Sequence, residues 1–323
     1  MIKKTIIILA VFLAGCTSNK TLKHPLDKSK SKTVVLENGL KVYLLSDPSF
    51  NVSAASVSVE VGSLDNPDDR QGLAHFLEHM LFLGTEKYPD VDEYSSYLKT
   101  YGGYSNAYTA SDHTNYQFQV LPDGFEGALD RFSQFFISPL FTEEYTAREV
   151  NAVNSEHQKN MLNDNWRQFR ISSLFAKEGH PERKFGTGNL ETLGDITREE
   201  LIRFYKQHYS ANRMGVALLS THSLEEMEDW CLQYFSSVKN RNLNRNTYDP
   251  NFLEKKETFR LIQIDPVKDV RNLNLLFSLP STRNLYKSKP GRQFGFILGY
   301  EGRGSLLSFL KQKGWALSLS AGA

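Results

Sequence analysis

Hydrophobic and polar positions alternate along the first part of the chain, and the period then changes to that of a helix. Residues 34–46 contain two β-rich runs around Asn38-Gly39, a dipeptide typical of a tight hairpin turn. Residues 52–62 alternate small or apolar side chains with polar ones, which predicts another strand. In residues 72–82 the apolar positions follow helical spacing instead.

The rest of the chain mixes helices and strands without a regular repeat. The pattern predicts helices over 90–101, 123–137, 142–175, 197–209 and 223–238, a loop over 180–193, and strands over 103–110, 114–121 and 213–220. One helix start is marked by a capping box, Thr197 with Glu200. Because no strict βαβ rhythm is present, we expect an α+β fold, with a mixed β-sheet packed against helices.

A polar segment rich in Asn and Arg, residues 239–257, predicts a linker between two domains. We assign 34–238 to the first domain and 258–323 to the start of a second, similar one. The β-rich run "FRLIQI" opens the second domain, and a strand is expected at its end in "GWALSLSAGA". Too few residues follow the linker to complete a domain, so we expect the sequence to be part of a longer protein.

The N-terminus has the pattern of a bacterial export signal. Lys3 and Lys4 precede an apolar run, Thr5–Leu13, which is shorter than the about 20 residues of a membrane-spanning helix. The following "LAGC" resembles a lipobox, so we interpret residues 1–16 as a lipoprotein signal peptide with Cys16 as the lipidated residue. An ordinary secretory signal with an incidental cysteine is the alternative.

The residues after Cys16 indicate where such an anchor would lie. Thr17 is not the aspartate associated with inner-membrane retention, so for a Gram-negative source we expect the outer membrane, facing the periplasm. The polar, Lys/Ser-rich stretch 17–33 predicts a flexible tether.

Composition excludes several classes of function. Lys and Arg number 38 against 37 Asp and Glu, so no net field favours nucleic acid. Only two cysteines occur, Cys16 and Cys231, which excludes a disulfide framework and a cysteine-rich metal site. Cys231 lies in an apolar helical pattern and is expected to be buried.

The stretch "HFLEHMLFLG", residues 75–84, places three polar groups in an apolar helix. His75, Glu78 and His79 share one helix face, because positions i, i+3 and i+4 lie together. Neutral imidazoles bind zinc, and a nearby carboxylate that is not a ligand can take a proton from water; this is the H-x-x-E-H pattern. The alternative is a helix whose histidines only pack.

A catalytic zinc site takes a third protein ligand. The stretch "REVNAVNSEHQKN" offers Glu149 and Glu156, seven residues and two helical turns apart on one face. Such carboxylates usually lie on a solvated face. The flanking apolar residues indicate a partly buried helix instead, where unpaired carboxylates would be costly.

Taken together, these and other motifs resemble the insulin-degrading enzyme and pitrilysin family of zinc metallopeptidases, in its branch of long single chains. The resemblance runs from about residue 34 to the end of the sequence. It rests on "GLAHFLEHMLFLGTEKYP", "YGGYSNAYTASDHTNYQF", "REVNAVNSEHQKN", "KFGTGNLETL" and "EGRGSLLSFLKQKGW". The family pattern implies that His75, His79 and Glu156 bind one zinc ion per chain, that Glu78 is the general base, and that Glu149 orients a ligand histidine.

The resemblance also implies how a peptide would bind. Asn106, Ala107 and Tyr108 match the family's edge strand, to which a bound peptide adds as an extra strand. An ordinary interior strand is the alternative.

A second substrate site is implied further along the chain. Gly299 and Glu301 match an exosite that holds the substrate's N-terminus, with Ser320 and Ala321 on its second strand. Tyr300 stands where the family often has a histidine, which leaves the exosite's preference open.

From the resemblance we expect a zinc endopeptidase that hydrolyses peptides or small unfolded polypeptides. The N-terminal pattern adds a lipid anchor, and the balanced charge predicts no nucleic-acid partner. A further C-terminal half is expected in the full-length protein. One alternative is a non-catalytic structural or peptide-binding lipoprotein of the same fold. Another is a truncated form that lacks the half needed for activity.

Overall fold

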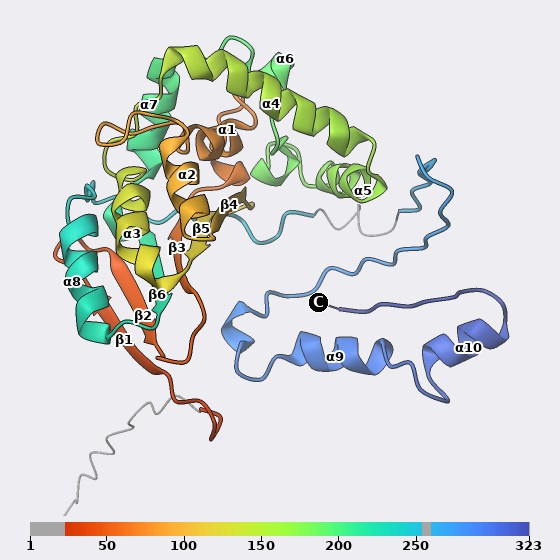
Figure 1. Cartoon of the computed structure of the whole chain (residues 1–323). Coiled ribbons are helices and arrows are strands. Elements are labelled where there is room, and N and C mark those ends of the chain that lie inside the picture. Colours follow the sequence, from red (N-terminus) through yellow and green to blue (C-terminus); the bar gives the residue numbers. More distant parts are fainter. Residues whose placement is uncertain (1–22, 254–259, 323) are drawn as a thin grey trace, which may run out of the picture.

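A six-stranded mixed sheet forms the centre of the computed structural model, which describes residues 23–253 and 260–322 (Figure 1). The strand order is β1-β2-β6-β3-β5-β4. β2 and β6 run parallel, and the other neighbouring strands run antiparallel. The strands are β1 (Lys30–Val35), β2 (Lys41–Ser46), β3 (Ser53–Val59), β4 (Tyr104–Thr109), β5 (Thr114–Val120) and β6 (Met214–Ser220).

The predicted hairpin at the start of the chain is confirmed. β1 and β2 pair in antiparallel register, and Gly39 supplies the positive φ of 84° that the turn requires. The Asn38 side chain donates to the carbonyl oxygens of Phe235 and Val238 at 2.9 Å. This turn therefore also holds the end of the last helix of the domain against the sheet.

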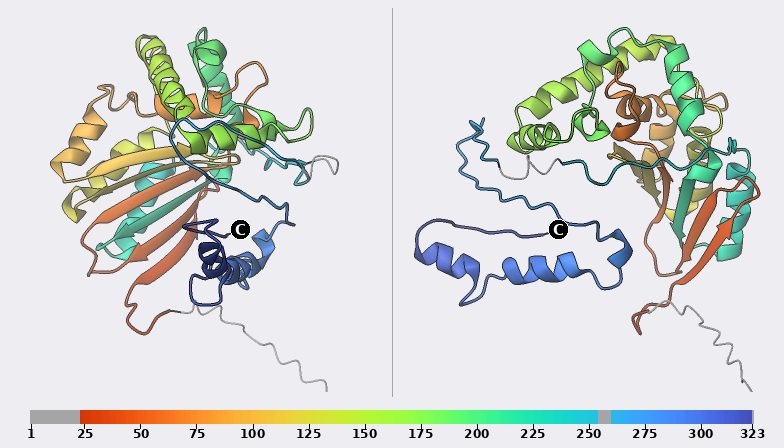
Figure 2. Two further views of the ribbon diagram at one scale, coloured as in Figure 1. Left: turned by 90° about the vertical axis from the view of Figure 1, so that its right-hand side faces the viewer. Right: turned by 180° about the vertical axis from the view of Figure 1, so that it is seen from behind.

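Helices cover one face of the sheet, and the core lies between them and the strands (Figures 1 and 2). Along β3, Ala55, Val57 and Val59 are buried on that face, whereas the alternate residues are partly exposed. The helices of this part are α1 (Leu73–Met80), α2 (Glu93–Thr100), α3 (Phe125–Gln134), α4 (Glu143–Met161), α5 (Asp164–Ser173), α6 (Leu190–Leu193), α7 (Arg198–His208) and α8 (Leu224–Phe235). Short 3-10 helices are η1 (Ser63–Asp65), η2 (Pro122–Gly124), η3 (Pro181–Arg183) and η4 (Ala211–Arg213).

Most of the predicted helices form where expected, and the capping box of Thr197 and Glu200 is present at the start of α7. The long helix expected over 142–175 is an exception, because it consists of α4 and α5. The break falls before Asn163, whose side chain accepts a hydrogen bond from the backbone of Asn165 and caps α5. A residue type that favours helix caps therefore ends one helix and begins another.

Two further boundaries differ from the prediction. β1 begins at Lys30, so the last residues of the predicted tether are part of the sheet. The loop expected over 180–193 contains η3 and α6.

The described part of the chain after the linker contains helices but no strand. It comprises η6 (Arg283–Leu285), α9 (Pro290–Leu298) and α10 (Leu306–Gln312), which lie apart from the sheet in Figure 1. The strands predicted for "FRLIQI" and the C-terminal run are therefore wrong over 260–264 and 314–322. A strand needs a neighbour for its backbone hydrogen bonds, and no second sheet is present among the described residues to supply one.

The signal peptide and Cys16 lie outside the described residues, so their assignment stays a prediction. Within residues 23–253 and 260–322, no helix has the length and apolarity needed to cross a membrane. Cys231 is buried in α8, as expected.

Candidate metal centre and peptide pocket

Helix α1 carries the H-x-x-E-H residues and is held by its own apolar side. Leu73, Phe76, Leu77 and Met80 are all buried in the core. This fixes the opposite side of the helix toward a pocket, where His75 and His79 lie one turn apart.

The two histidine rings face each other across a short gap. Their Nε2 atoms are 3.2 Å apart. The Nδ1 atom of His75 lies 2.8 Å from the carbonyl oxygen of Thr187, and Nδ1 of His79 lies 2.7 Å from a carboxylate oxygen of Glu149. Because both partners are acceptors, both Nδ1 atoms donate. In the neutral rings, each Nε2 therefore presents a lone pair to the other, an arrangement that a cation between them would relieve.

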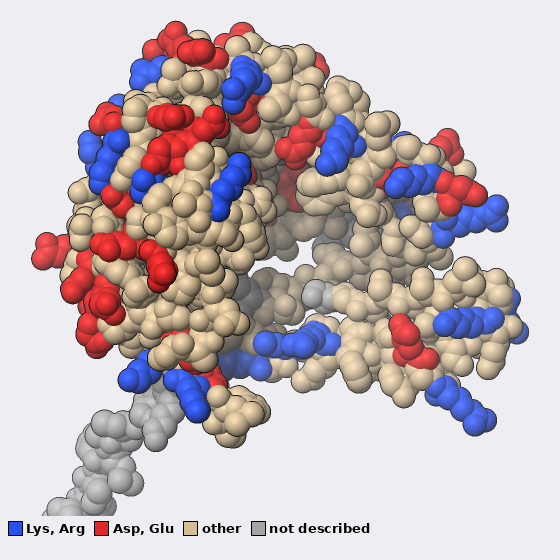
Figure 3. Space-filling view, in the orientation of Figure 1, with Lys and Arg blue, Asp and Glu red and all other residues tan. Residues whose placement is uncertain are grey.

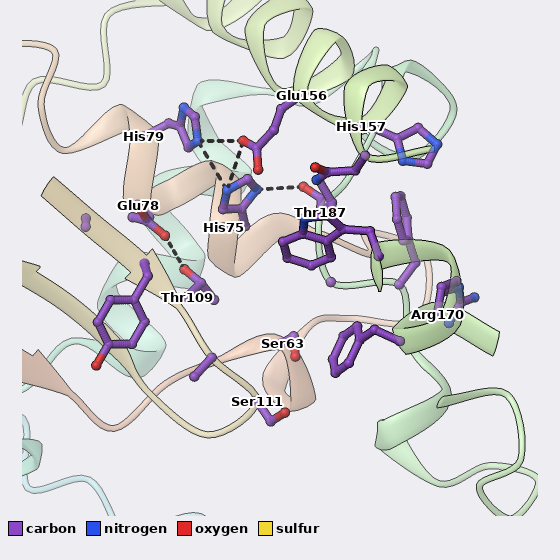
Figure 4. A pocket seen from close by; sticks show the side chains of 18 of the residues that line it. Ser63, His75, Glu78, His79, Thr109, Ser111, Glu156, His157, Arg170 and Thr187 are labelled. Atoms are coloured by element: carbon purple, nitrogen blue, oxygen red, sulfur yellow. Dashed lines mark hydrogen bonds and ion pairs between the residues drawn. The ribbon is translucent and has the colours of Figure 1, made fainter. Parts of the chain in front are cut away.

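Glu156 of α4 completes this group. Its Oε2 lies 3.5 Å from Nε2 of His75 and 3.7 Å from Nε2 of His79 (Figure 4). Zinc bonds of about 2.0–2.2 Å in tetrahedral geometry place ligand atoms about 3.3 Å apart. The three side chains offer ligand atoms within 4.8 Å of one another. The donor set therefore fits a zinc ion in both chemistry and spacing.

Electrostatics at the site favour positive charge. Burial opposes a charge on His79, but its interactions with Glu149 and Glu156 outweigh burial and raise the pKa of His79 to about 9. The hydrogen bond with His79 is in turn the main cause that lowers the pKa of Glu156. The carboxylates thus compensate a cation held beside the histidines.

Glu78 points toward the same pocket but is not part of the metal-ligating group. Its side chain is buried, which raises its pKa, while His75 and a hydrogen bond from Thr109 act in the opposite direction. Thr109 Oγ1 donates to Glu78 Oε2 at 2.6 Å (Figure 4). Sequence spacing pointed to Glu78 but gave no indication of Thr109 or Thr187, because both contacts arise from tertiary packing.

A pocket of about 1240 Å³ opens beside these residues. One side is formed by α1 and by β4, including Asn106, Ala107 and Tyr108. The opposite side carries aromatic side chains: Trp166 and Phe169 from α5, and Phe185 from the loop before α6. Among the described residues, β4 pairs only with β5 and lies at the edge of the sheet, the position that the resemblance implied.

Gly299 and Glu301 lie away from this pocket and do not line it. Gly299 directly follows α9 as its C-cap, and a Cβ placed on it would lie 3.5 Å from the backbone nitrogen of Ala321. The two segments implied for the exosite are therefore neighbours, although residues 314–322 form no strand.

Charge is unevenly distributed over the surface. Acidic side chains gather over α3 and α8 (Figure 3). The lining of the pocket, in contrast, includes the acidic Glu182 and the basic Arg170 and Lys184. The pocket thus carries both signs, and charge alone does not select a substrate class.

Two family models match the chain. "Insulinase (Peptidase family M16)" matches residues 41–178, and "Peptidase M16 inactive domain" matches residues 195–323. The chain belongs to the M16 family of peptidases. The second match begins at residue 195, inside the region 34–238 that the sequence pattern assigned to the first domain.

Individual M16 relatives agree with this result. Human insulin-degrading enzyme is 45% identical over 311 residues, covering 94% of this chain and 30% of that protein. The A-factor-processing enzyme of Saccharomyces cerevisiae is 44% identical over 308 residues, covering 93% and 30%. The crystal structure of pitrilysin matches with a TM-score of 0.81 at 29% identity, covering 94% of this chain and 33% of that one. The chain thus has a pitrilysin-like fold but spans about a third of the length of these relatives.

Proposed function

We propose that this protein is a zinc-dependent endopeptidase whose metal is held by His75, His79 and Glu156. The observation that carries the proposal is the meeting of these three ligands from α1 and α4 beside the buried carboxyl of Glu78, at one end of a pocket bounded by an edge strand. The similarity to M16 peptidases supports it.

The roles of the residues follow from their positions. When bound, zinc would lower the pKa of a water molecule and polarise the scissile carbonyl. Glu78 takes the proton of the attacking water and delivers it to the leaving amine. Its raised pKa suits this exchange, because a carboxyl group that both accepts and releases a proton works best near the operating pH. Glu149 holds His79 in the tautomer whose Nε2 would bind the metal.

The substrate class follows from the strand edge. A peptide in extended conformation adds to β4 through backbone hydrogen bonds along Asn106, Ala107 and Tyr108, which gives affinity with loose sequence selectivity. The aromatic side of the pocket then contacts the peptide's apolar side chains. Gly299, which lies beside Ala321, and Glu301 hold the N-terminus of a longer substrate in an exosite.

The location of the protein is also part of the proposal. The N-terminal sequence supports export, lipidation at Cys16 and attachment to the outer membrane facing the periplasm. Labelling with a radioactive fatty acid in wild type, and its loss in Cys16→Ser, would test the anchor.

The central experiment is cleavage of a quenched fluorescent peptide of about 12 residues, long enough to pair along a strand of ordinary length. It is run with zinc, with a chelator, and with Glu78→Gln. We expect chelator-sensitive hydrolysis that Glu78→Gln lacks although it retains zinc. Glu144→Gln is the matched control, because Glu144 is an exposed carboxylate at the start of α4.

Zinc content is measured alongside activity, and Glu156→Gln should lose the metal. Equal zinc retention in Glu156→Gln and wild type would refute the ligand assignment. Zinc-loaded, folded protein without hydrolysis would instead mean that these 323 residues do not suffice for activity, or that the protein is a non-catalytic peptide-binding member of its family.

A further inference from the structure

The segment Lys184–Leu190, here called the bridging loop, lies between the two helices that carry the metal-binding side chains. Its Thr187 carbonyl accepts the Nδ1 hydrogen of His75 at 2.8 Å (Figure 4). This contact fixes the ring orientation and leaves Nε2 as the atom that faces His79 and Glu156.

The bridging loop and the start of α1 approach each other closely, backbone to backbone. A Cβ placed on Gly72, the residue that precedes α1, would lie 2.3 Å from Cα of Gly188. Both glycines have positive φ, 93° and 85°. Only glycine fits this contact without displacing the backbone. Because Gly72 stands three residues before His75, this contact fixes where the loop lies along α1 relative to His75.

Side chains add further connections to α1. Gln71 Oε1 accepts a 2.7 Å hydrogen bond from the backbone nitrogen of Phe185. Lys184 Nζ donates to the carbonyl oxygen of Asn66 at 2.5 Å, and the Asn66 side chain accepts from the backbone of Ala74 at 2.8 Å. The start of the loop is thus tied to the first turn of α1.

The other end of the loop is tied to α4. The backbone nitrogen of Leu190 donates to the Asn154 side chain at 3.3 Å. Asn154 precedes Glu156 by two residues on that helix. The loop therefore connects the helix that holds two ligands with the helix that holds the third.

We propose that the bridging loop positions the metal site: it fixes the tautomer of His75 and sets the distance between α1 and α4. This inference rests on the proposed zinc site. It assigns a role to residues that bind no metal themselves, chiefly Gln71, Gly72 and Gly188. Loss of an outer partner of a metal-ligating histidine lowers metal affinity about 10- to 100-fold.

The test measures zinc affinity of the full chain by competition with a chromophoric chelator, without reference to activity. Gln71→Met removes the acceptor for Phe185, and Gln71→Glu keeps it. We expect weaker zinc binding in Gln71→Met, near wild-type binding in Gln71→Glu, and an affinity about 10- to 100-fold lower in Gly72→Ala. The visible spectrum of the cobalt-substituted protein should change in Gly72→Ala, because the His75 ring is displaced.

Gly179→Ala is the control for backbone strain. Gly179 has a similar positive φ of 75°, but a Cβ on it would meet no described residue within 4 Å. Should Gly72→Ala fail to fold, the comparison of Gln71→Met with Gln71→Glu decides. Wild-type affinity and cobalt spectrum in Gln71→Met and in any folded Gly72→Ala would overturn the positioning role. A wild-type chain that binds no zinc would overturn the proposed function itself and, with it, this inference.

Discussion

His75 and His79 present their Nε2 atoms to each other at 3.2 Å, while each ring donates its Nδ1 hydrogen to an oxygen atom distant in the sequence. The carbonyl of Thr187 holds one ring, and the carboxylate of Glu149 holds the other. The folded chain therefore directs the two Nε2 atoms toward each other, as the proposed zinc site requires. Such an arrangement lowers the cost of ordering ligands when a metal binds.

The contact between His79 and Glu149 leads to the first prediction. Glu149→Gln removes the negative charge but keeps an oxygen that can accept the Nδ1 hydrogen. Zinc affinity should fall about tenfold in Glu149→Gln, the lower limit of the about 10- to 100-fold loss that follows removal of an outer partner. It should fall further in Glu149→Ala. Competition titration with a chelator measures this, with Glu144→Gln as the control on the same helix. Equal affinity in Glu149→Ala and wild type would contradict the orienting role.

The local part of this site could be predicted from sequence, because helical spacing alone puts His75 beside His79 and Glu149 on the same face as Glu156. Their meeting across α1 and α4 could not be derived from spacing and came from the family resemblance. Thr109 and Thr187 escaped prediction altogether. Thr109 acts through its side chain at the end of an edge strand, and Thr187 acts through its backbone carbonyl. Neither contact produces a periodic pattern in the sequence.

In the fold as well, features encoded by neighbouring residues could be predicted, whereas features that depend on distant contacts could not. The hairpin around Asn38-Gly39 and the capped helix after Thr197 are encoded by neighbouring residues, and both form as predicted. The strands expected after the linker depend on pairing with other strands. Apolar side chains such as Leu261, Phe277 and Trp315 remain largely exposed there, so a β-rich pattern alone did not produce a sheet.

The hydrogen bond from Thr109 to Glu78 yields a second prediction. Thr109→Val keeps the shape of the side chain but removes the donor. Since this bond lowers the pKa of Glu78 against the effect of burial, its loss should raise that pKa further. Thr109→Ser keeps the hydroxyl and should restore the wild-type value. Carbon-13 NMR of the labelled carboxyl groups in zinc-free protein, assigned with Glu78→Gln, gives the titration directly. An unchanged or lowered pKa in Thr109→Val would disprove the role of the bond.

A third prediction concerns stability away from the site. Arg131 forms two-pronged hydrogen bonds with Glu93, and its guanidinium lies 4.6 Å and 3.9 Å from the ring centres of Tyr88 and Tyr97. Lysine cannot reproduce either the fork or the stacking. Arg131→Lys should lower the free energy of unfolding by about 1–2 kcal/mol. Urea denaturation measures this loss.

Zinc affinity should stay unchanged in Arg131→Lys, because neither Arg131 nor its partners line the pocket. This separates a stability effect from an effect on the site. Urea curves that coincide for Arg131→Lys and wild type would show that the network contributes little.

The last prediction uses Cys231 as a probe of the folded domain. The thiol is 1% exposed, and burial raises its pKa to about 12. The pKa rises because burial disfavours the charged thiolate relative to the neutral thiol. At about pH 8, only about one thiol in ten thousand would therefore be ionised. In these 323 residues carrying Cys16→Ser, where Cys231 is the remaining cysteine, Ellman's reagent should react very slowly with native protein and rapidly after guanidinium unfolding. Prompt reaction of the native protein would mean that α8 opens readily from the sheet, contrary to the packing of Cys231 in the core.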